Sequence, residues 1–113
     1  MPRKVFDMSM VRGDTYSFDL IVRDIDPESI ETIYFTVKKR ATDPDSEAVF
    51  QKSFENGIEL IGERTYRVRV APQDTDNVAA KKYVYDIQFR INNDVYTMVT
   101  GGFNIEQDVT EAI

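Results

Sequence analysis

The sequence predicts an all-β chain, a two-layer antiparallel β-sandwich of seven or eight strands with one short helical turn near residues 72–80. Three observations lead to this prediction. Apolar residues recur at every second position in segment after segment, which is the period of a half-buried strand. Turn residues separate these segments at intervals of roughly 8 to 12 residues. No stretch sustains the 3.6-residue period of a long helix, so neither a helical bundle nor a βαβ fold is favoured.

The first sixty residues contain five expected strands. The two strongest show alternating apolar residues, namely Tyr16, Phe18, Leu20 and Val22 in one and Ile33, Phe35 and Val37 in the other. Weaker strands are expected over 5–10, over 48–54 with Phe50 and Phe54 inward, and over 58–61. Because side chains alternate between the two faces of a strand, each apolar series would line one wall of the core.

Three strands in the second half complete the sandwich. Their alternating apolar residues are Tyr66, Val68 and Val70 in one strand and Tyr83, Tyr85, Ile87, Phe89 and Ile91 in the next. The last strand covers 95–106 and is interrupted by Gly101-Gly102. A glycine pair inside a strand indicates a bulge or a close backbone approach, after which Phe103 and Ile105 would return to the core face.

Turns and one crossover connect these strands. Asn56-Gly57, Asn92-Asn93 and Gly62-Glu63 supply residues that tolerate a positive φ, as tight hairpins require. Over 72–80, Pro72 and the acidic residues after it suit a helix N-terminus, and this turn would cross between the two sheets. Tyr83 or Tyr85 would then form the tyrosine corner found in immunoglobulin-like sandwiches.

Length and composition exclude several classes of function. A chain of 113 residues has room for one core, so we expect a single domain over 1–113. The absence of cysteine and histidine removes disulfides, thiol nucleophiles, the commonest general base and the commonest metal ligand. A net charge of −6 disfavours nucleic acid or an anionic membrane as a partner. We therefore expect neither an enzyme nor a cofactor-binding protein.

One short motif has a functional and a structural interpretation. Arg12-Gly13-Asp14 is the tripeptide that integrins bind when a loop tip displays it. The favoured interpretation is a tight turn between the first two strands, with Gly13 supplying backbone freedom and Asp14 capping a local amide.

Acidic residues suggest two more kinds of site, and neither is favoured. Alternating carboxylates of the kind that bind calcium occur as Asp24, Asp26 and Glu28 and as Asp43, Asp45 and Glu47, without the spacing of an EF-hand. Glycoside cleavage needs a carboxylate pair in a pocket. The candidates Asp86 and Asp19 are expected on outward faces, where solvated surface is the better interpretation. We predict no catalytic residue, no metal ligand and no cofactor-binding residue.

Outward aromatic residues are better candidates for protein contacts. Tyr34 lies on the polar side of its strand, and either Val84 or Tyr96 would also face outward. Exposed tyrosine is favoured at protein interfaces. The outer faces would also carry Arg67, Arg69 and Arg90, for which acids on neighbouring strands are the expected partners.

Several of these segments together resemble a known family. The relevant segments are Arg12-Gly13-Asp14-Thr15, Phe35-Thr36-Val37-Lys38, Asp74-Thr75 before Tyr83-x-Tyr85-Asp86-Ile87, Gly102-Phe103-x-Ile105 and Asp108-Val109-Thr110. This string resembles the immunoglobulin-like domain of virion proteins from tailed phages of Gram-positive bacteria, best known as the N-terminal domain of baseplate upper proteins. The resemblance spans residues 8–110, and each motif in it is short.

The resemblance implies a non-enzymatic structural or interaction module of a phage or prophage particle, as a tail, baseplate or neck accessory protein. Its partners would be other phage structural proteins, and a sheet edge offers a route to homo-oligomers. Its location would be the virion, or the cytoplasm of the bacterial host during assembly. Residues 1–10 lack the apolar stretch of a secretory signal, so we expect no export by a signal peptide. Baseplate upper proteins continue into a long stalk, which this sequence does not contain. A carbohydrate- or ligand-binding sandwich module stays open as the alternative.

Overall fold

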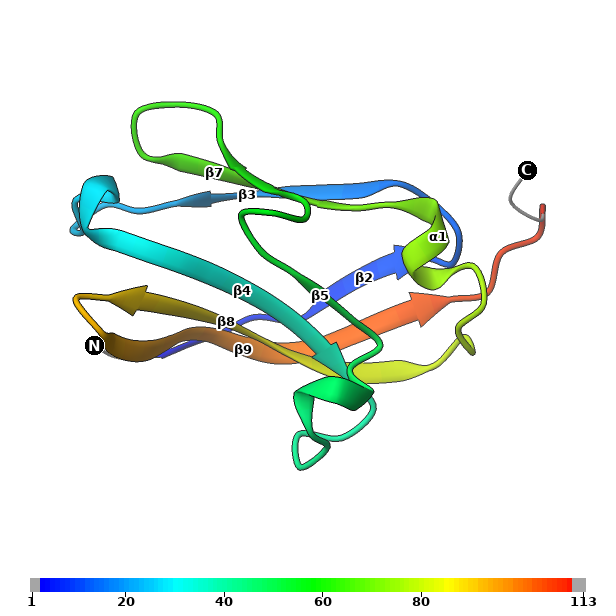
Figure 1. Ribbon diagram of the computed structural model, residues 1–113. Helices are drawn as coiled ribbons and strands as arrows, with labels where there is room; N and C mark the ends of the chain where they lie inside the picture. The colour runs from blue at the N-terminus through cyan, green and yellow to red at the C-terminus, as the bar shows by residue number, and fades with distance from the viewer. Residues whose placement is uncertain (1–2, 111–113) are drawn as a thin grey trace.

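The computed structural model describes residues 3–110, in which nine strands form two stacked sheets (Figure 1). Residues 1–2 and 111–113 of the predicted domain lie outside the described range. The larger sheet is ordered β1 (Lys4–Val5), β9 (Asp94–Glu106), β8 (Lys82–Ile91), β4 (Ile30–Lys38) and β5 (Phe50–Lys52), and β2 (Met8–Val11) also pairs with β9. The smaller sheet is ordered β3 (Tyr16–Ile21), β7 (Thr65–Val70) and β6 (Ile58–Leu60). The all-β sandwich prediction is confirmed.

The strand order is that of an immunoglobulin-like sandwich. The smaller sheet takes β3 and the pair β6–β7 that precedes the crossover. The larger sheet takes the hairpin β8–β9, with β4 and then β5 beside β8. The sheets are not wholly antiparallel, because β1 and β2 both run parallel to β9. The single strand expected over 5–10 is also split, with a break at Phe6 and Asp7, and the described strands therefore number nine rather than seven or eight.

Alternation places the core between the sheets. Fully buried side chains from both sheets meet there, namely Ile33, Phe35, Val37, Val68, Val70, Ile87 and Phe103. The ring of Phe103 lies 5.9 Å from those of Phe35 and Phe50 and 6.3 Å from that of Tyr85, in tilted or edge-to-face contacts. Each buried side chain of this size contributes about 1.5 to 3 kcal/mol.

The hairpin turns are explained by backbone conformation. Asn92 and Asn93 both have positive φ, 52° and 69°, as a type I′ turn between β8 and β9 requires. Gly57 has φ 94°. The expectation for Gly62-Glu63 was wrong, because neither residue has a positive φ and the longer β6–β7 connection needs none.

The crossover between β7 and β8 begins with α1 (Pro72–Thr75), a single turn that confirms the short helical turn predicted near 72–80. After it, Val78 is partly buried against the core. The Tyr83 hydroxyl donates to the carbonyl of Ala79 at 2.6 Å, so Tyr83 and not Tyr85 forms the tyrosine corner.

Within residues 3–110, no helix has the length and apolar character needed to cross a membrane.

A buried ion pair holds α1 against β5. Lys52 is only 3% exposed, and its ammonium lies 2.5 Å from the carboxylate of Asp74. The same carboxylate accepts the Ala71 amide N–H at 2.7 Å. Because a buried charge is stable only when it is paired, these contacts fix the crossover in place.

At Gly101 the backbone of β9 comes close to the backbone of Phe6. For the glycine pair the sequence predicted either a bulge or such a close approach, and the second prediction is confirmed. A Cβ on Gly101 would lie 2.7 Å from the carbonyl carbon of Phe6 and nearer still to its oxygen. That oxygen accepts a hydrogen bond from the Tyr85 hydroxyl. The bulge lies elsewhere, because the β8–β9 register skips Met98. Phe103 and Ile105 are buried as predicted.

Candidate functional site

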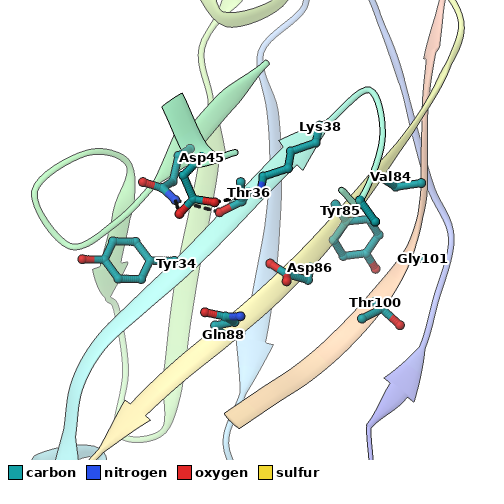
Figure 2. Close-up of a pocket in the computed structure, with 12 residues that line it drawn as sticks. Tyr34, Thr36, Lys38, Asp45, Val84, Tyr85, Asp86, Gln88, Thr100 and Gly101 are labelled. Carbon is teal, nitrogen blue, oxygen red and sulfur yellow. Dashed lines mark hydrogen bonds and ion pairs between the residues drawn. The ribbon is translucent and has the colours of Figure 1, made fainter. Parts of the chain in front are cut away.

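The outer face of the larger sheet carries a groove of about 520 Å³ (Figure 2). Its floor is formed by the outward side chains of β4, β8 and β9, and one wall is formed by the 3₁₀ turn η2 (Asp45–Glu47) with the residues before it. Tyr34, Asp86 and Gln88 lie on this floor in Figure 2. The prediction that Tyr34 faces outward is confirmed, since 40% of it is exposed.

Strand register aligns the polar side chains in rows across the sheet. Thr36 pairs with Gln51 on one side and with Asp86 on the other, and Asp86 pairs in turn with Thr100. One polar row therefore crosses β5, β4, β8 and β9. A second row places Tyr34 directly opposite Gln88.

Some of these polar groups are used to build the wall of the groove. The Lys38 ammonium lies 2.7 Å from the Asp45 carboxylate and donates to the Asp43 carbonyl at 2.8 Å. The Gln51 side-chain amide donates to the Thr36 hydroxyl at 2.9 Å. The ammonium of Lys38 also holds the pKa of the Asp45 carboxyl below its ordinary value. The contacts of Lys38 fix η2 and the residue Asp43 before it against the sheet.

The remaining polar groups face the groove. Within residues 3–110, the side chains of Tyr34, Asp86, Gln88 and Thr100 make no hydrogen bond to the protein, although all four line the groove. Burial raises the pKa of the Asp86 carboxyl, an effect that Lys38 opposes and Asp45 reinforces. Perturbed groups in a concave surface are typical of functional sites.

A second feature is the open edge of β3. The Val22 amide donates to the Arg64 carbonyl at 2.9 Å, so the even-numbered residues of β3 point their backbone groups toward β7. The backbone groups of Ser17, Asp19 and Ile21 point the other way, where no described strand pairs with β3. β3 has six residues, whereas the edge strands β5 and β6 have three each.

An apolar groove of about 340 Å³ runs beside this edge. Its apolar lining comes from both sheets and the N-terminal strands, namely Phe6, Met8, Tyr16, Phe18, Leu20, Ile87 and Val99. It exists because β1 and β2 join β9, which leaves the smaller sheet one strand short of the four in a constant-type immunoglobulin sheet.

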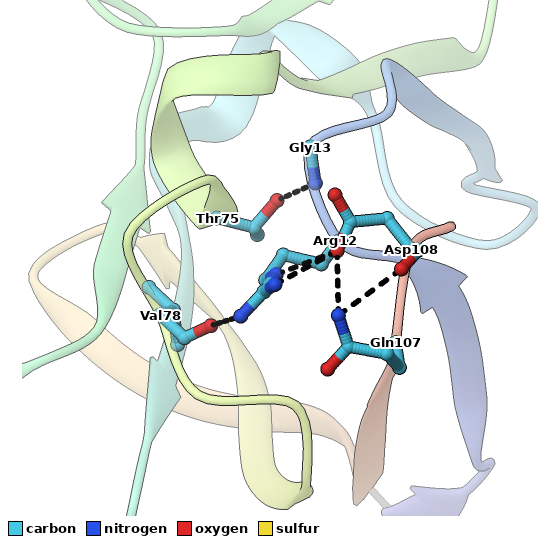
Figure 3. A network of polar contacts seen from close by, with 6 residues as sticks. All are labelled: Arg12, Gly13, Thr75, Val78, Gln107 and Asp108. Carbon is cyan, nitrogen blue, oxygen red and sulfur yellow. Dashed lines mark hydrogen bonds and ion pairs between the residues drawn. The ribbon is translucent and has the colours of Figure 1, made fainter. Parts of the chain in front are cut away.

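The Arg12-Gly13-Asp14 motif forms a structural turn (Figure 3). Gly13 has φ 82°, and the Asp14 amide donates to the Val11 carbonyl at 3.1 Å, which is a type II turn. The Arg12 guanidinium lies 2.9 Å from the Asp108 carboxylate, so it is not displayed at a loop tip.

A buried hydroxyl completes this end of the sandwich. Thr75 is fully buried, and its Oγ1 accepts the Gly13 amide N–H at 2.8 Å. The capping role expected of Asp14 therefore belongs to Thr75.

The other acidic candidates do not come together. No group of three or more acidic residues within 3–110 is placed to hold a metal ion. Asp26 accepts the Glu28 amide at 3.0 Å as a cap of the 3₁₀ turn η1 (Pro27–Ser29). Asp19 lies on β3 and Asp86 on β8, on the outer faces of different sheets, so they cannot act as one carboxylate pair. Asp86 lies half-buried in the groove, which corrects the expectation that it is fully solvated.

The outward arginines mostly pair as expected. Arg67 forms a two-pronged contact with Asp19 at 2.9 and 3.3 Å, and Arg90 lies 3.7 Å from Glu31. Val84 faces the groove. Tyr96 pairs with Phe89, which faces the core, so Tyr96 lies on the inner face of the sheet. Of the two candidates, Val84 is therefore the one that faces outward.

Sequence reasoning missed the groove as a unit. Its floor residues Thr36, Gln88 and Thr100 occupy the polar positions of strands whose apolar positions predicted the core. The alternation of apolar and polar residues was therefore enough to predict that these three side chains share the outer face of the sheet. The wall of the groove could not be predicted from the local sequence, because η2 is held against the sheet by tertiary contacts.

Comparisons with known proteins agree with the fold and leave the activity open. No protein-family model matches the chain, and no curated protein sequence matches it. An endo-β-1,4-mannanase from Thermotoga petrophila is similar in structure, with a TM-score of 0.58 at 13% identity over 89% of this chain, which corresponds to 18% of that enzyme. The extracellular domain of the voltage-gated sodium channel β4 subunit aligns over 96% of this chain and 97% of its own, at 10% identity and a TM-score of 0.45. At these identities the likeness concerns the fold alone. The strand order and the tyrosine corner described above make the chain an immunoglobulin-like β-sandwich.

Proposed function

We propose that this chain is a non-enzymatic interaction module of a phage or prophage particle, acting as a tail, baseplate or neck accessory protein. The proposal is based on the resemblance of residues 8–110 to the immunoglobulin-like domain of phage virion proteins. The fold that this resemblance implies is the fold of the chain. Other phage structural proteins are the proposed partners, rather than nucleic acid or a membrane. The proposed location is the virion, or the host cytoplasm during assembly.

The open edge of β3 is the observation that best supports a docking role. An extended segment of a partner can add to an open strand edge through main-chain hydrogen bonds, while its alternate side chains fill an adjacent groove. β3 offers the outward backbone groups of Ser17, Asp19 and Ile21 for this purpose, and the apolar groove lies beside them. A second copy of the chain could use the same edge, which keeps the homo-oligomer as part of the proposal.

Mass spectrometry of purified particles tests this function. Particles from cells that express the chain with its neighbouring genes should contain it. Ser17→Pro removes one outward N–H and no β3–β7 hydrogen bond, and we expect it to lower incorporation at least tenfold. Ser17→Ala, which keeps the N–H, should incorporate normally. Particles that lack the wild-type chain would refute the proposal, and normal incorporation of the proline variant would refute docking through β3.

The second candidate function is a carbohydrate- or ligand-binding module. The specific observation in its favour is the groove on the larger sheet, in which the side chains of Tyr34, Asp86, Gln88 and Thr100 make no hydrogen bond to residues 3–110 of the protein.

A further inference from the structure

The groove on the larger sheet has the dimensions of a site for a short chain-like ligand, an inference that rests on the second candidate function. Its volume of about 520 Å³ lies within the range of roughly 300 to 1,000 Å³ that is typical of ligand pockets. The polar row from Gln51 to Thr100 crosses four strands, and three strand spacings amount to about 14 Å. The site is therefore an elongated cleft and not a cage for a small ion.

The charges of the groove disfavour an anionic ligand. Lys38 is the one cation among its described lining residues, and its ammonium is already neutralised by Asp45. Asp86 adds a carboxylate that no protein cation contacts within 4 Å among residues 3–110. Phosphates and acidic sugars would meet this negative charge without a compensating cation.

The unused polar groups suit hydroxyl groups on a ligand. An ionised carboxylate such as that of Asp86 only accepts hydrogen bonds, so it selects a donor such as a hydroxyl. Gln88 and Thr100 can each donate and accept. A ligand carrying many hydroxyls satisfies all three, because each hydroxyl is both a donor and an acceptor.

Apolar surface lies next to these polar groups. Tyr34 is 40% exposed and lies directly across from Gln88 on the neighbouring strand, and Val84 and Ala41 line the same groove. A sugar ring combines a C–H face, which packs on an aromatic ring, with a rim of hydroxyls. Tyrosine is suited to such contacts because it presents an apolar face and a polar tip.

We propose that the groove binds a neutral oligosaccharide, with Asp86, Gln88 and Thr100 hydrogen-bonded to its hydroxyls and the ring of Tyr34 packed against a sugar face. The walls are held in place by the bonds from Lys38 to the η2 segment, so the site is formed before the ligand arrives.

Amide NMR titrations test the proposal with defined probes. The neutral probes are cellohexaose, mannohexaose and chitohexaose, complemented by an array of neutral bacterial glycans. Trigalacturonate serves as the acidic probe, and a trilysine peptide represents a cationic occupant. We expect at least one neutral glycan to shift the amide signals of Tyr34, Thr36, Asp86 and Gln88, with no comparable effect from trigalacturonate or trilysine.

Substitutions assign the binding to the groove. Asp86→Asn and Tyr34→Ala should each weaken binding at least tenfold, whereas Tyr34→Phe should weaken it less because the ring remains. Asp19→Asn is the matched control, since Asp19 lies mid-strand on the outer face of the other sheet and should not affect affinity. The amide spectrum of each variant reports whether it is folded.

Several outcomes would overturn the proposal. They are the absence of binding by every neutral glycan, a response to trilysine alone, or affinity unchanged in both Asp86→Asn and Tyr34→Ala. Failure of glycan binding can be distinguished from failure of docking through β3. Ser17→Pro should leave glycan binding unchanged, and Asp86→Asn should leave incorporation into the particle unchanged.

Discussion

Replacing Gly101 by alanine is expected to separate the N-terminal strands from the rest of the larger sheet. The added methyl group would occupy the position of the Phe6 carbonyl, which is backbone and cannot swing aside as a side chain can. The break between β1 and β2 would have to move away from β9. The hydrogen bond from the Tyr85 hydroxyl to Phe6 would then be lost.

The expected loss of stability follows from these two effects. Overpacking at a close contact costs about 1 to 3 kcal/mol, and the lost hydrogen bond adds about 1 kcal/mol. The total is about 2 to 4 kcal/mol. With an unfolding entropy of about 0.24 kcal/mol/K for 113 residues, this lowers Tm by roughly 8 to 17 °C. Thermal and urea unfolding measure the loss, and amide hydrogen exchange over residues 4–11 reports where it arises.

The neighbouring glycine provides a matched control. A Cβ on Gly102 would meet nothing closer than the Asp7 Oδ1 at 3.5 Å, an ordinary van der Waals distance, and its amide could still donate to that oxygen. We expect Gly102→Ala to be neutral or to stabilise by up to about 1 kcal/mol. A Gly101→Ala variant as stable as the wild type, with unchanged exchange protection in β1 and β2, would refute the close-approach explanation.

Three further substitutions test individual contacts. Thr75→Val should destabilise by about 1 to 3 kcal/mol, because it leaves the part-buried Gly13 N–H without its acceptor, and Thr75→Ser should recover most of the loss in urea unfolding. Tyr85→Phe should cost about 1 kcal/mol at pH 8. Burial raises the pKa of Tyr85 to about 12, so this wild-type advantage should disappear as pH rises from 10 to about 12, where the unfolded phenol ionises first. Asp86→Asn should raise the denaturation midpoint at neutral pH, because burial raises the pKa of this carboxyl and folding disfavours its charged form. The gain should shrink as pH falls and the wild-type carboxyl becomes protonated.

Each of these expectations has a contrary result. Equal stability of Thr75→Val and the wild type would mean that another group satisfies the Gly13 amide. A Tyr85→Phe difference that stays constant up to pH 12 would exclude burial of the phenol. A destabilised Asp86→Asn variant at pH 7 would mean that the carboxylate supports the fold.

Local alternation was sufficient to predict most of the sandwich. The strands around Phe18, Val68 and Ile87 were correctly placed because their period-2 pattern is long and uninterrupted. The parallel pairing of β1 and β2 with β9 was not predictable in this way. It joins segments about 95 residues apart. Gly101 indicated that some backbone comes close to the last strand, but not that this backbone is the break between β1 and β2 at Phe6.

The motif string that carries the phage resemblance reports mainly on the fold. Arg12 pairs with Asp108, Gly13 donates to Thr75, and the Tyr83 hydroxyl closes the corner beside them. All these contacts stabilise one end of the sandwich. The string also includes Thr36, Lys38 and Asp86, which line the groove, but as isolated polar positions they gave no sign of a common surface. The sequence therefore predicted the architecture better than it predicted a binding surface.

The side-by-side, same-direction course of β2 and β9 has a mechanical consequence. A pull applied near residues 3 and 110 acts along these neighbouring strands in opposite directions and loads their shared hydrogen bonds in shear. Bonds loaded in shear resist together, whereas bonds at the end of a hairpin open one after another. The lifetime under tension then depends on the unfolding rate and not on equilibrium stability. A domain connected in this way keeps its shape when attachments at its two ends are drawn apart.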